Sequence, residues 1–245
     1  MRKFASDVLV IFEIELLKLR AWWPLYIVIV IVFPIGTLYF AKWLIPPSAE
    51  NLVGTRLMTG SLVFALGLMT VNNLAQVLLT ERFSNTLKLV MTSPVHPLSY
   101  AAGIVAFSLV LGMLTAAAVL SFSPVVGINI HLNLWLAPVL ALTSLSLTGI
   151  GVVIATWAPT AEIGNLLANV TGIIVVMLSP VYFPIERLPH WLQWVVRFSP
   201  YTHAGAAVDG ILSGRGGYGH EVVYLALITS AGLVVGVMGL RWREN

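Results

Sequence analysis

Amide side chains are the groups that could do chemistry in the long apolar segments of this sequence, because no Asp, Glu, Lys or Arg occurs from Leu89 to Ala161. Asn and Gln bind polar groups by hydrogen bonds without supplying a charge. They form two sets at helical spacing, which are Asn72, Asn73 and Gln76, and Asn165 and Asn169. Both sets could hold a polar group of a ligand. The alternative is hydrogen bonding between neighbouring helices, a common role of amides in membranes.

The charged stretch from residue 81 to residue 98 is the second candidate site, since it interrupts two long apolar segments. An apolar face recurs there at i, i+4, i+7 and i+8, formed by Phe83, Leu87, Val90 and Met91. Glu81, Arg82 and Lys88 lie among these residues. Such a short amphipathic helix can rest on lipid headgroups, or it can dock in a groove of a soluble partner.

Motifs for catalysis are absent from the sequence. No Gly-Lys pair occurs, so the chain has no phosphate-binding P-loop, and neither the His-Glu-x-x-His nor the Gly-x-Ser-x-Gly pattern is present. Cysteine is absent as well. We therefore expect no catalytic residue, no metal site and no cofactor in this chain, and no enzymatic activity of its own.

The composition predicts an all-α integral membrane protein. Hydrophobic residues make up 58% of the chain and charged residues 9%, against about 25% charged residues in soluble domains. The thirteen Lys and Arg residues are scattered, which argues against nucleic acid as a partner. We expect one permease-like membrane domain over residues 1–245, anchored in the lipid bilayer.

Six apolar segments are long enough to cross the membrane, at about 20 residues for each crossing. They cover residues 21–44, 57–80, 100–122, 134–157, 163–182 and 222–240. Residues 1–20 place apolar side chains on one face and predict an amphipathic helix in the membrane interface, although Glu15 falls on the apolar face. Pro34 lies inside the first segment and is expected to kink it.

The distribution of basic residues predicts cytoplasmic termini in a cell (plasma) membrane. Six crossings place eight basic residues on the side of the termini, namely Arg2, Lys3, Lys18, Arg20, Arg82, Lys88, Arg241 and Arg243. Five lie on the opposite side, namely Lys42, Arg56, Arg187, Arg197 and Arg215. Cytoplasmic loops carry the excess of positive charge in membrane proteins.

The external segment 183–220 is too polar to cross the membrane as a whole. Trp191, Trp194, Val195 and Phe198 follow helical spacing and predict a short amphipathic helix before Pro200. A second short helix is expected from about residue 202 to residue 212, and both are predicted to be re-entrant. His203 and Asp209 could face one another there, or make ordinary external hydrogen bonds.

Two segments resemble those of type-2 ABC exporter permeases, the membrane subunits of drug and lipid exporters. After the second predicted span, the resemblance lies in Glu81-Arg82, Asn85-Thr86-Leu87, Thr92-Ser93-Pro94-Val95, Pro97-Leu98 and Gly103, with Asn85 where Gly is usual. After the fifth, it lies in Phe183-Pro184, Leu188-Pro189, Trp191 and Ser199-Pro200. The family more often has Asn-Pro at the last position and a basic residue near Asp209.

The resemblance implies a six-helix permease that exports an amphipathic or lipid-like substrate. It implies that residues 81–98 hold the coupling helix, with Glu81, Arg82, Phe83, Leu87, Val90 and Met91 as the ATPase-coupling residues. It also implies that the second and fifth spans line the substrate path, which makes their amides the substrate-path candidates, namely Asn72, Asn73, Gln76, Asn165 and Asn169. The expected partners are two copies of an ABC ATPase subunit, which bind ATP and Mg, and a second permease, identical or related. The absence of ionisable residues deep in the spans argues against ion-coupled transport. A passive channel or membrane scaffold without an ATPase partner remains the alternative.

Overall fold

The computed structural model describes residues 2–43, 50–84, 92, 95–175, 179–183 and 185–239, and every regular element in these ranges is a helix. The predicted all-α class is confirmed. The elements are α1 (Arg2–Ala21), α2 (Trp23–Ile27), η1 (Val28–Val32), α3 (Phe33–Trp43), α4 (Glu50–Gly67), η3 (Leu68–Asn72), α5 (Asn73–Phe83), α7 (Pro97–Ser121), α8 (Ser123–Val126), α9 (Leu136–Trp157), α10 (Ala161–Val170), η4 (Thr171–Val175), η5 (Ile185–Arg187), α12 (His190–Arg197), α13 (Pro200–Leu212) and α14 (Gly219–Gly239).

Within the described ranges, four helices are long and apolar enough to cross a membrane. They cover Trp23–Phe40, Gly54–Phe83, Leu98–Val126 and Leu136–Trp157. The expected fifth and sixth spans fall on α10 with η4 and on α14, and their crossing of the membrane stays a prediction. The second helix extends further than expected, because Glu81, Arg82 and Phe83 form the last turn of α5 rather than the start of a loop.

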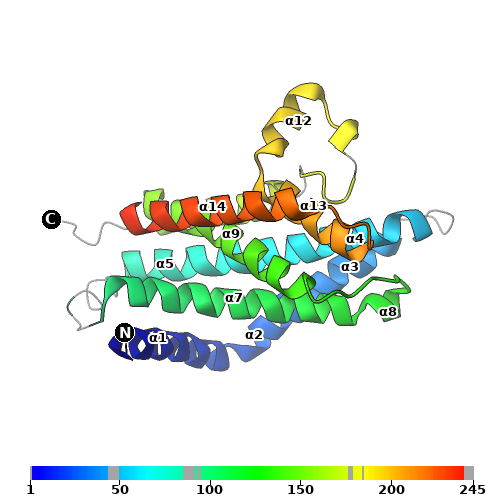
Figure 1. Ribbon diagram of the computed structural model, residues 1–245. Coiled ribbons are helices and arrows are strands. Elements are labelled where there is room, and N and C mark those ends of the chain that lie inside the picture. Colours follow the sequence, from blue (N-terminus) through cyan, green and yellow to red (C-terminus); the bar gives the residue numbers. More distant parts are fainter. Residues whose placement is uncertain are drawn as a thin grey trace.

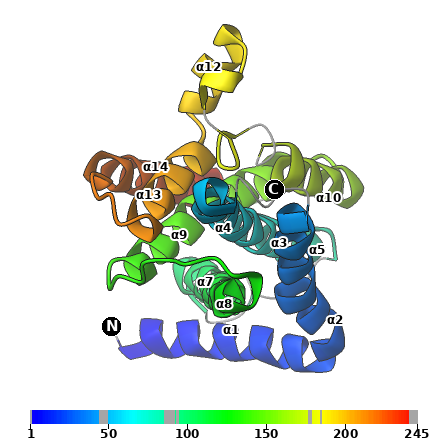
Figure 2. The same ribbon diagram turned by 90° about the vertical axis from the view of Figure 1, so that its right-hand side faces the viewer.

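The long helices α4–α5, α7, α9 and α14 run side by side along one axis (Figure 1). The view along that axis places α4 in the centre, surrounded by α3, α7, α9 and α13 (Figure 2). Its side chains at Met58, Leu62 and Leu66 are fully buried. This central position explains why α4 shows no amphipathic pattern, since a helix that is covered on all sides is apolar all round.

Helix α1 lies across the bundle, roughly at right angles to the long helices (Figure 2). It packs on α7, where Gly103 allows the close approach, because a Cβ at Gly103 would lie 2.7 Å from Ile11. The packed face includes Ile11 and Glu15, which the sequence placed on the apolar face, but it leaves Leu16 of that face out. Glu15 is buried and Leu16 is exposed, and the reason is an ion pair of Glu15 with Lys18 that keeps the carboxylate satisfied against the bundle.

In the part of the chain that the structure describes, three π-helical turns interrupt the long helices. In the first span, η1 directly precedes Pro34, whose ring nitrogen cannot donate to the carbonyl of Val30. The sequence predicted that Pro34 would disturb this helix, and the structure has a wider, π-helical turn ahead of it. The other two turns, η3 and η4, are not preceded by any proline signal and contact one another.

The external segment forms two helices with opposite environments. Helix α13 packs against α4, α9 and α14, and its Tyr201, Val208 and Leu212 are fully buried. Helix α12 projects from the side of the bundle (Figures 1 and 2). It exposes Trp191, Trp194 and Val195, and Phe198 directly after it is exposed as well, whereas its Val196 is buried.

Candidate functional site

Arg82 joins the end of α5 to the end of α9. Its Nη1 atom donates to the carbonyl oxygens of Ala155, Thr156 and Ala158, each at 3.0 Å. The last carbonyls of a helix have no partner within the helix and carry a partial negative charge. A guanidinium at this position therefore caps α9, and its side chain points into the bundle rather than towards a docking partner.

Glu81 joins the same turn of α5 to α1. Lys18 Nζ lies 3.3 Å from Glu81 Oε1 and also forms an ion pair with Glu15. Both carboxylates are buried, whereas the Lys18 side chain is 49% exposed. Burial lowers the pKa of Lys18, but the hydrogen bonds and charges of Glu15 and Glu81 outweigh burial and raise the pKa above its usual 10.5. Lys18 is therefore a charged clamp between two buried acids.

The predicted coupling face continues from this turn. Phe83 is 41% exposed, and the Arg82 guanidinium lies 5.1 Å from the centre of its ring. Leu87, Val90 and Met91 lie outside the described residues. Of the three predicted coupling residues that the structure describes, Glu81 and Arg82 anchor the turn internally and Phe83 lies at the surface.

The amides of the second span point to different neighbours. Asn73 Nδ2 donates to Ser108 Oγ on α7 at 3.2 Å, which is a hydrogen bond between helices. Asn72 is half-buried on the other side, where a Cβ on Gly172 of η4 would lie 3.5 Å from its Nδ2 atom. Gln76, one turn further along, is exposed. Asn73 is therefore a packing residue, separated from Asn72 and Gln76.

Helix α10 packs on α5 through the buried Gly164 and Ala168, whereas Asn165 is half-buried and Asn169 is exposed. Gly164 faces Leu79 and Gly172 faces Asn72, so the two helices run antiparallel. In this register, Asn165 and Asn169 lie between the two glycines, level with the Gln76 turn. Asn169 is exposed and donates to the carbonyl of Asn165 at 2.9 Å.

Two amide oxygens in this region are buried without a hydrogen bond to any described residue, namely Asn72 Oδ1 and Asn165 Oδ1. Buried polar atoms are normally satisfied, and an exception often marks a functional position. Asn72 is also the last residue of η3, which packs against η4. π-Helical turns inside α-helices frequently occur at functional sites. Sequence reasoning missed this pairing of two π turns, for which the sequence carries no recognisable signal.

Arrangements for catalysis are not found in the described part of the chain, where no three His, Asp or Glu side chains are placed to hold a metal ion. His203 and Asp209 do not pair with one another, because each has a different partner. Asp209 pairs with Arg215, while His203 pairs with Glu221 and stacks on Tyr224 at 3.6 Å. The possible pairing of His203 with Asp209 is therefore wrong. Arg215 supplies the basic partner of Asp209 that the sequence left open.

Comparisons with known proteins identify the same class of molecule. The family model for the ABC-2 type transporter matches residues 17–212. The chain is also similar to Nodulation protein J of Rhizobium leguminosarum bv. trifolii, with 29% identity over 82 residues, which is 34% of this chain and 31% of that protein. The matched region of the family model contains α5, α9, α10 and the amide-bearing face between them.

Proposed function

The chain belongs to the ABC-2 type transporter family, whose members are membrane components of ABC transporters, and from this premise we propose that it is the permease subunit of an ATP-driven exporter. A separate subunit hydrolyses ATP in this proposal, because the chain has no P-loop. Two such ATPase subunits and a second permease, identical or related, complete the complex. The termini and residues 81–98 face the cytoplasm.

The double attachment of the last turn of α5 is the observation that carries the proposal. Glu81 holds this turn to α1 through Lys18, and Arg82 holds it to the carboxyl end of α9. Residues 85–91 follow directly, so a displacement of this segment by a partner pulls on three helices at once. A packed bundle transmits such a displacement as a rigid body, because close-packed interiors deform little.

The face between α5 and α10 is the proposed path of the substrate. It carries Gln76 and Asn169 as exposed amides among exposed apolar side chains of α10, such as Leu166 and Val170. Exposed amides in contact with hydrocarbon would be unfavourable. A second permease packed over this face encloses them in a shared, partly polar route. No charged side chain lies on this stretch of either helix, which fits an amphipathic or lipid-like substrate.

The movement that opens the route is assigned to the π turns. Asn72 of η3 faces Gly172 of η4, so the two π-helical turns meet at this point. A change between π and α geometry shifts one helix against the other by part of a turn. Asn72 and Asn165 would then gain hydrogen bonds to substrate that they lack in this structure.

Co-purification tests the proposal. The chain is purified in mild detergent from its native cells, and P-loop ATPases are quantified in the wild type, Leu87→Asp and Val125→Asp. Val125 is 71% exposed on α8, remote from the loop, and serves as the matched control for an added acid. We expect a stoichiometric ATPase with the wild type and with Val125→Asp, and its loss with Leu87→Asp.

The other outcomes contradict the proposal. A wild-type chain that carries no ATPase would favour the passive channel or scaffold. Recovery of the ATPase at the wild-type level with both Leu87→Asp and Phe83→Asp would show that the complex forms without the predicted coupling face. Export by reconstituted complexes, measured with and without ATP, then separates an exporter from an assembly that binds ATP without moving a substrate.

A further inference from the structure

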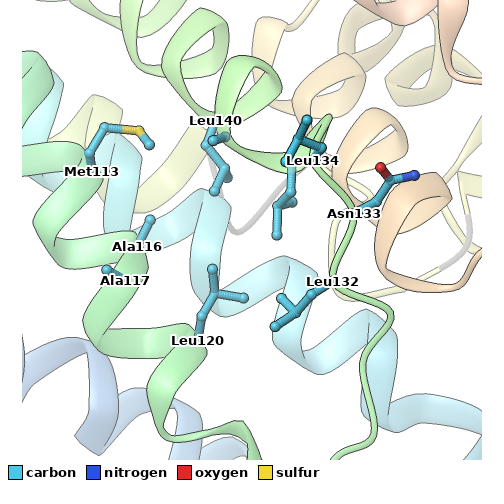
Figure 3. Close-up of a pocket in the computed structure, with 10 residues that line it drawn as sticks. Met113, Ala116, Ala117, Leu120, Leu132, Asn133, Leu134 and Leu140 are labelled. Atoms are coloured by element: carbon cyan, nitrogen blue, oxygen red, sulfur yellow. The ribbon is translucent and has the colours of Figure 1, made fainter.

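A cavity of about 420 Å³ lies between α7 and α9, beneath the segment that connects α8 to α9 (Figure 3). Met113 and Leu120 project from α7, Leu140 comes from α9, and Leu132 and Leu134 come from the connecting segment. Their side chains point towards a common space (Figure 3). The cavity exists because alanines occupy the positions where the two helices would otherwise fill the gap, at 116 and 117 of α7 and 137 of α9.

The walls of this cavity are hydrocarbon. Asn133 is the polar residue among those that line it, and its amide points away from the centre (Figure 3). Water is not a suitable occupant, since an internal water needs two to four polar partners and apolar cavities stay dry.

The cavity opens onto an apolar surface of the bundle. It lies between two helices that are able to cross the membrane, Leu98–Val126 and Leu136–Trp157. The same surface of α7 continues into exposed apolar side chains at Val110 and Leu114. Trp135 is 62% exposed at the start of α9, where the chain turns back into the bundle. An exposed tryptophan next to the end of a span is typical of the headgroup level of a bilayer.

We propose that this cavity is a binding site for one acyl chain of a bilayer phospholipid, with the headgroup held at the level of Asn133 and Trp135. The lining has the chemistry of the hydrocarbon tail, and the opening is continuous with the lipid-facing surface of α7. The lipid acts as a structural filler between α7 and α9 and is not cargo, because the cavity lies on the opposite side of the bundle from α10 (Figure 2). The assignment does not rest on the proposed export function.

Native mass spectrometry of the chain purified with phosphatidylethanolamine tests the site. Ala117→Phe and Ala137→Phe each place a ring in the cavity from a different helix, so one variant remains informative if the other fails to fold. Ala226→Phe is the matched control, because Ala226 is also an exposed alanine of an apolar helix. We expect the wild type and the control to retain one phospholipid more than the two filling variants. The control should also have the same thermal stability as the wild type.

A photoactivatable phosphatidylethanolamine, with a diazirine in one acyl chain, locates the bound lipid. We expect its cross-links to concentrate in peptides covering residues 113–140 and to decrease there in Ala137→Phe. Equal lipid retention in all four proteins, or cross-links spread evenly over α7 and α14, would overturn the site. Release of the retained lipid on ATP hydrolysis in the assembled complex would make it transported cargo, and would overturn its assignment as a fixed bilayer lipid.

Discussion

Lys18 and Glu81 are 63 residues apart in the sequence, yet Lys18 Nζ lies 3.3 Å from Glu81 Oε1. This contact ties the helix that lies across the bundle to the end of a central membrane helix. Glu15 and Glu81 are 3% and 7% exposed, so each would be a buried charge with a poor environment if the lysine were absent. The half-exposed ammonium group therefore helps to hold α1 on the bundle, in addition to the packing of α1 on α7.

Removing this ammonium should loosen α1. We expect Lys18→Met to lower the free energy of unfolding by about 2 kcal/mol, since hydrogen bonds to charged groups contribute roughly that much and leaving a buried acid unpaired adds to the loss. Lys3→Met, on the exposed part of the same helix, is the control. Thermal unfolding in detergent measures both variants. Equal midpoints would show that the clamp is not needed.

The same clamp predicts a dependence on alkaline pH. Because the folded-state pKa of Lys18 lies above its usual 10.5, the stabilisation is fully present below about pH 10.5 and is lost as the pH rises through the folded-state value. Lys18→Arg keeps its charge at these pH values. Thermal midpoints between pH 9 and the alkaline limit of the detergent should therefore decrease more steeply for the wild type than for Lys18→Arg. Parallel curves would refute the role of Lys18.

Arg82 should protect the end of α9. Replacing it by Met removes the donor to the carbonyls of Ala155, Thr156 and Ala158, and we expect a loss of about 2 kcal/mol from the cap and the helix dipole together. Hydrogen exchange of the peptide covering residues 155–163 should accelerate. Arg20→Met, which changes an exposed arginine, is expected to leave this peptide unchanged.

A close approach of backbones joins α9 to α14. A Cβ on Gly149 would lie 3.1 Å from Gly232 Cα, and neither backbone can move aside as a flexible side chain would. We expect Gly149→Ala to destabilise the fold by about 2 kcal/mol through overpacking. Gly36→Ala, at a helical glycine with nothing within 4 Å, should be neutral or slightly stabilising. Equal thermal midpoints of Gly149→Ala and Gly36→Ala would contradict this packing role.

Asn72 and Asn73 should separate function from packing. Asn72→Leu removes a buried oxygen that has no described partner, so we expect stability to be kept while ATP-dependent transport falls. Asn73→Leu breaks the bond to Ser108 and should lower stability by about 1 kcal/mol. Transport by reconstituted complexes and thermal unfolding are measured for both. Normal transport by Asn72→Leu would remove the second span from the proposed route.

Predictions from the sequence pattern agree with the described structure where the predicted feature depends on the residues of a single helix. The all-α class, the helix near the amino terminus and the short helix that carries Trp191 and Trp194 each follow from apolar spacing, a property of a few neighbouring residues. The lack of Gly-Lys likewise excludes a P-loop in this chain without any knowledge of its fold.

Tertiary structure decided which polar residues belong together. The sequence placed Glu81 and Arg82 on a docking loop and grouped Asn73 with Asn72, but the structure turns the first two towards α1 and α9 and Asn73 towards α7. Adjacent residues on a helix point about 100° apart, so their partners depend on which helices surround them. The sequence therefore determined the membrane class and the helices. The pairing of helices, which depends on contacts between distant segments, set the clamp at Lys18, the cap at Arg82 and the cavity between α7 and α9.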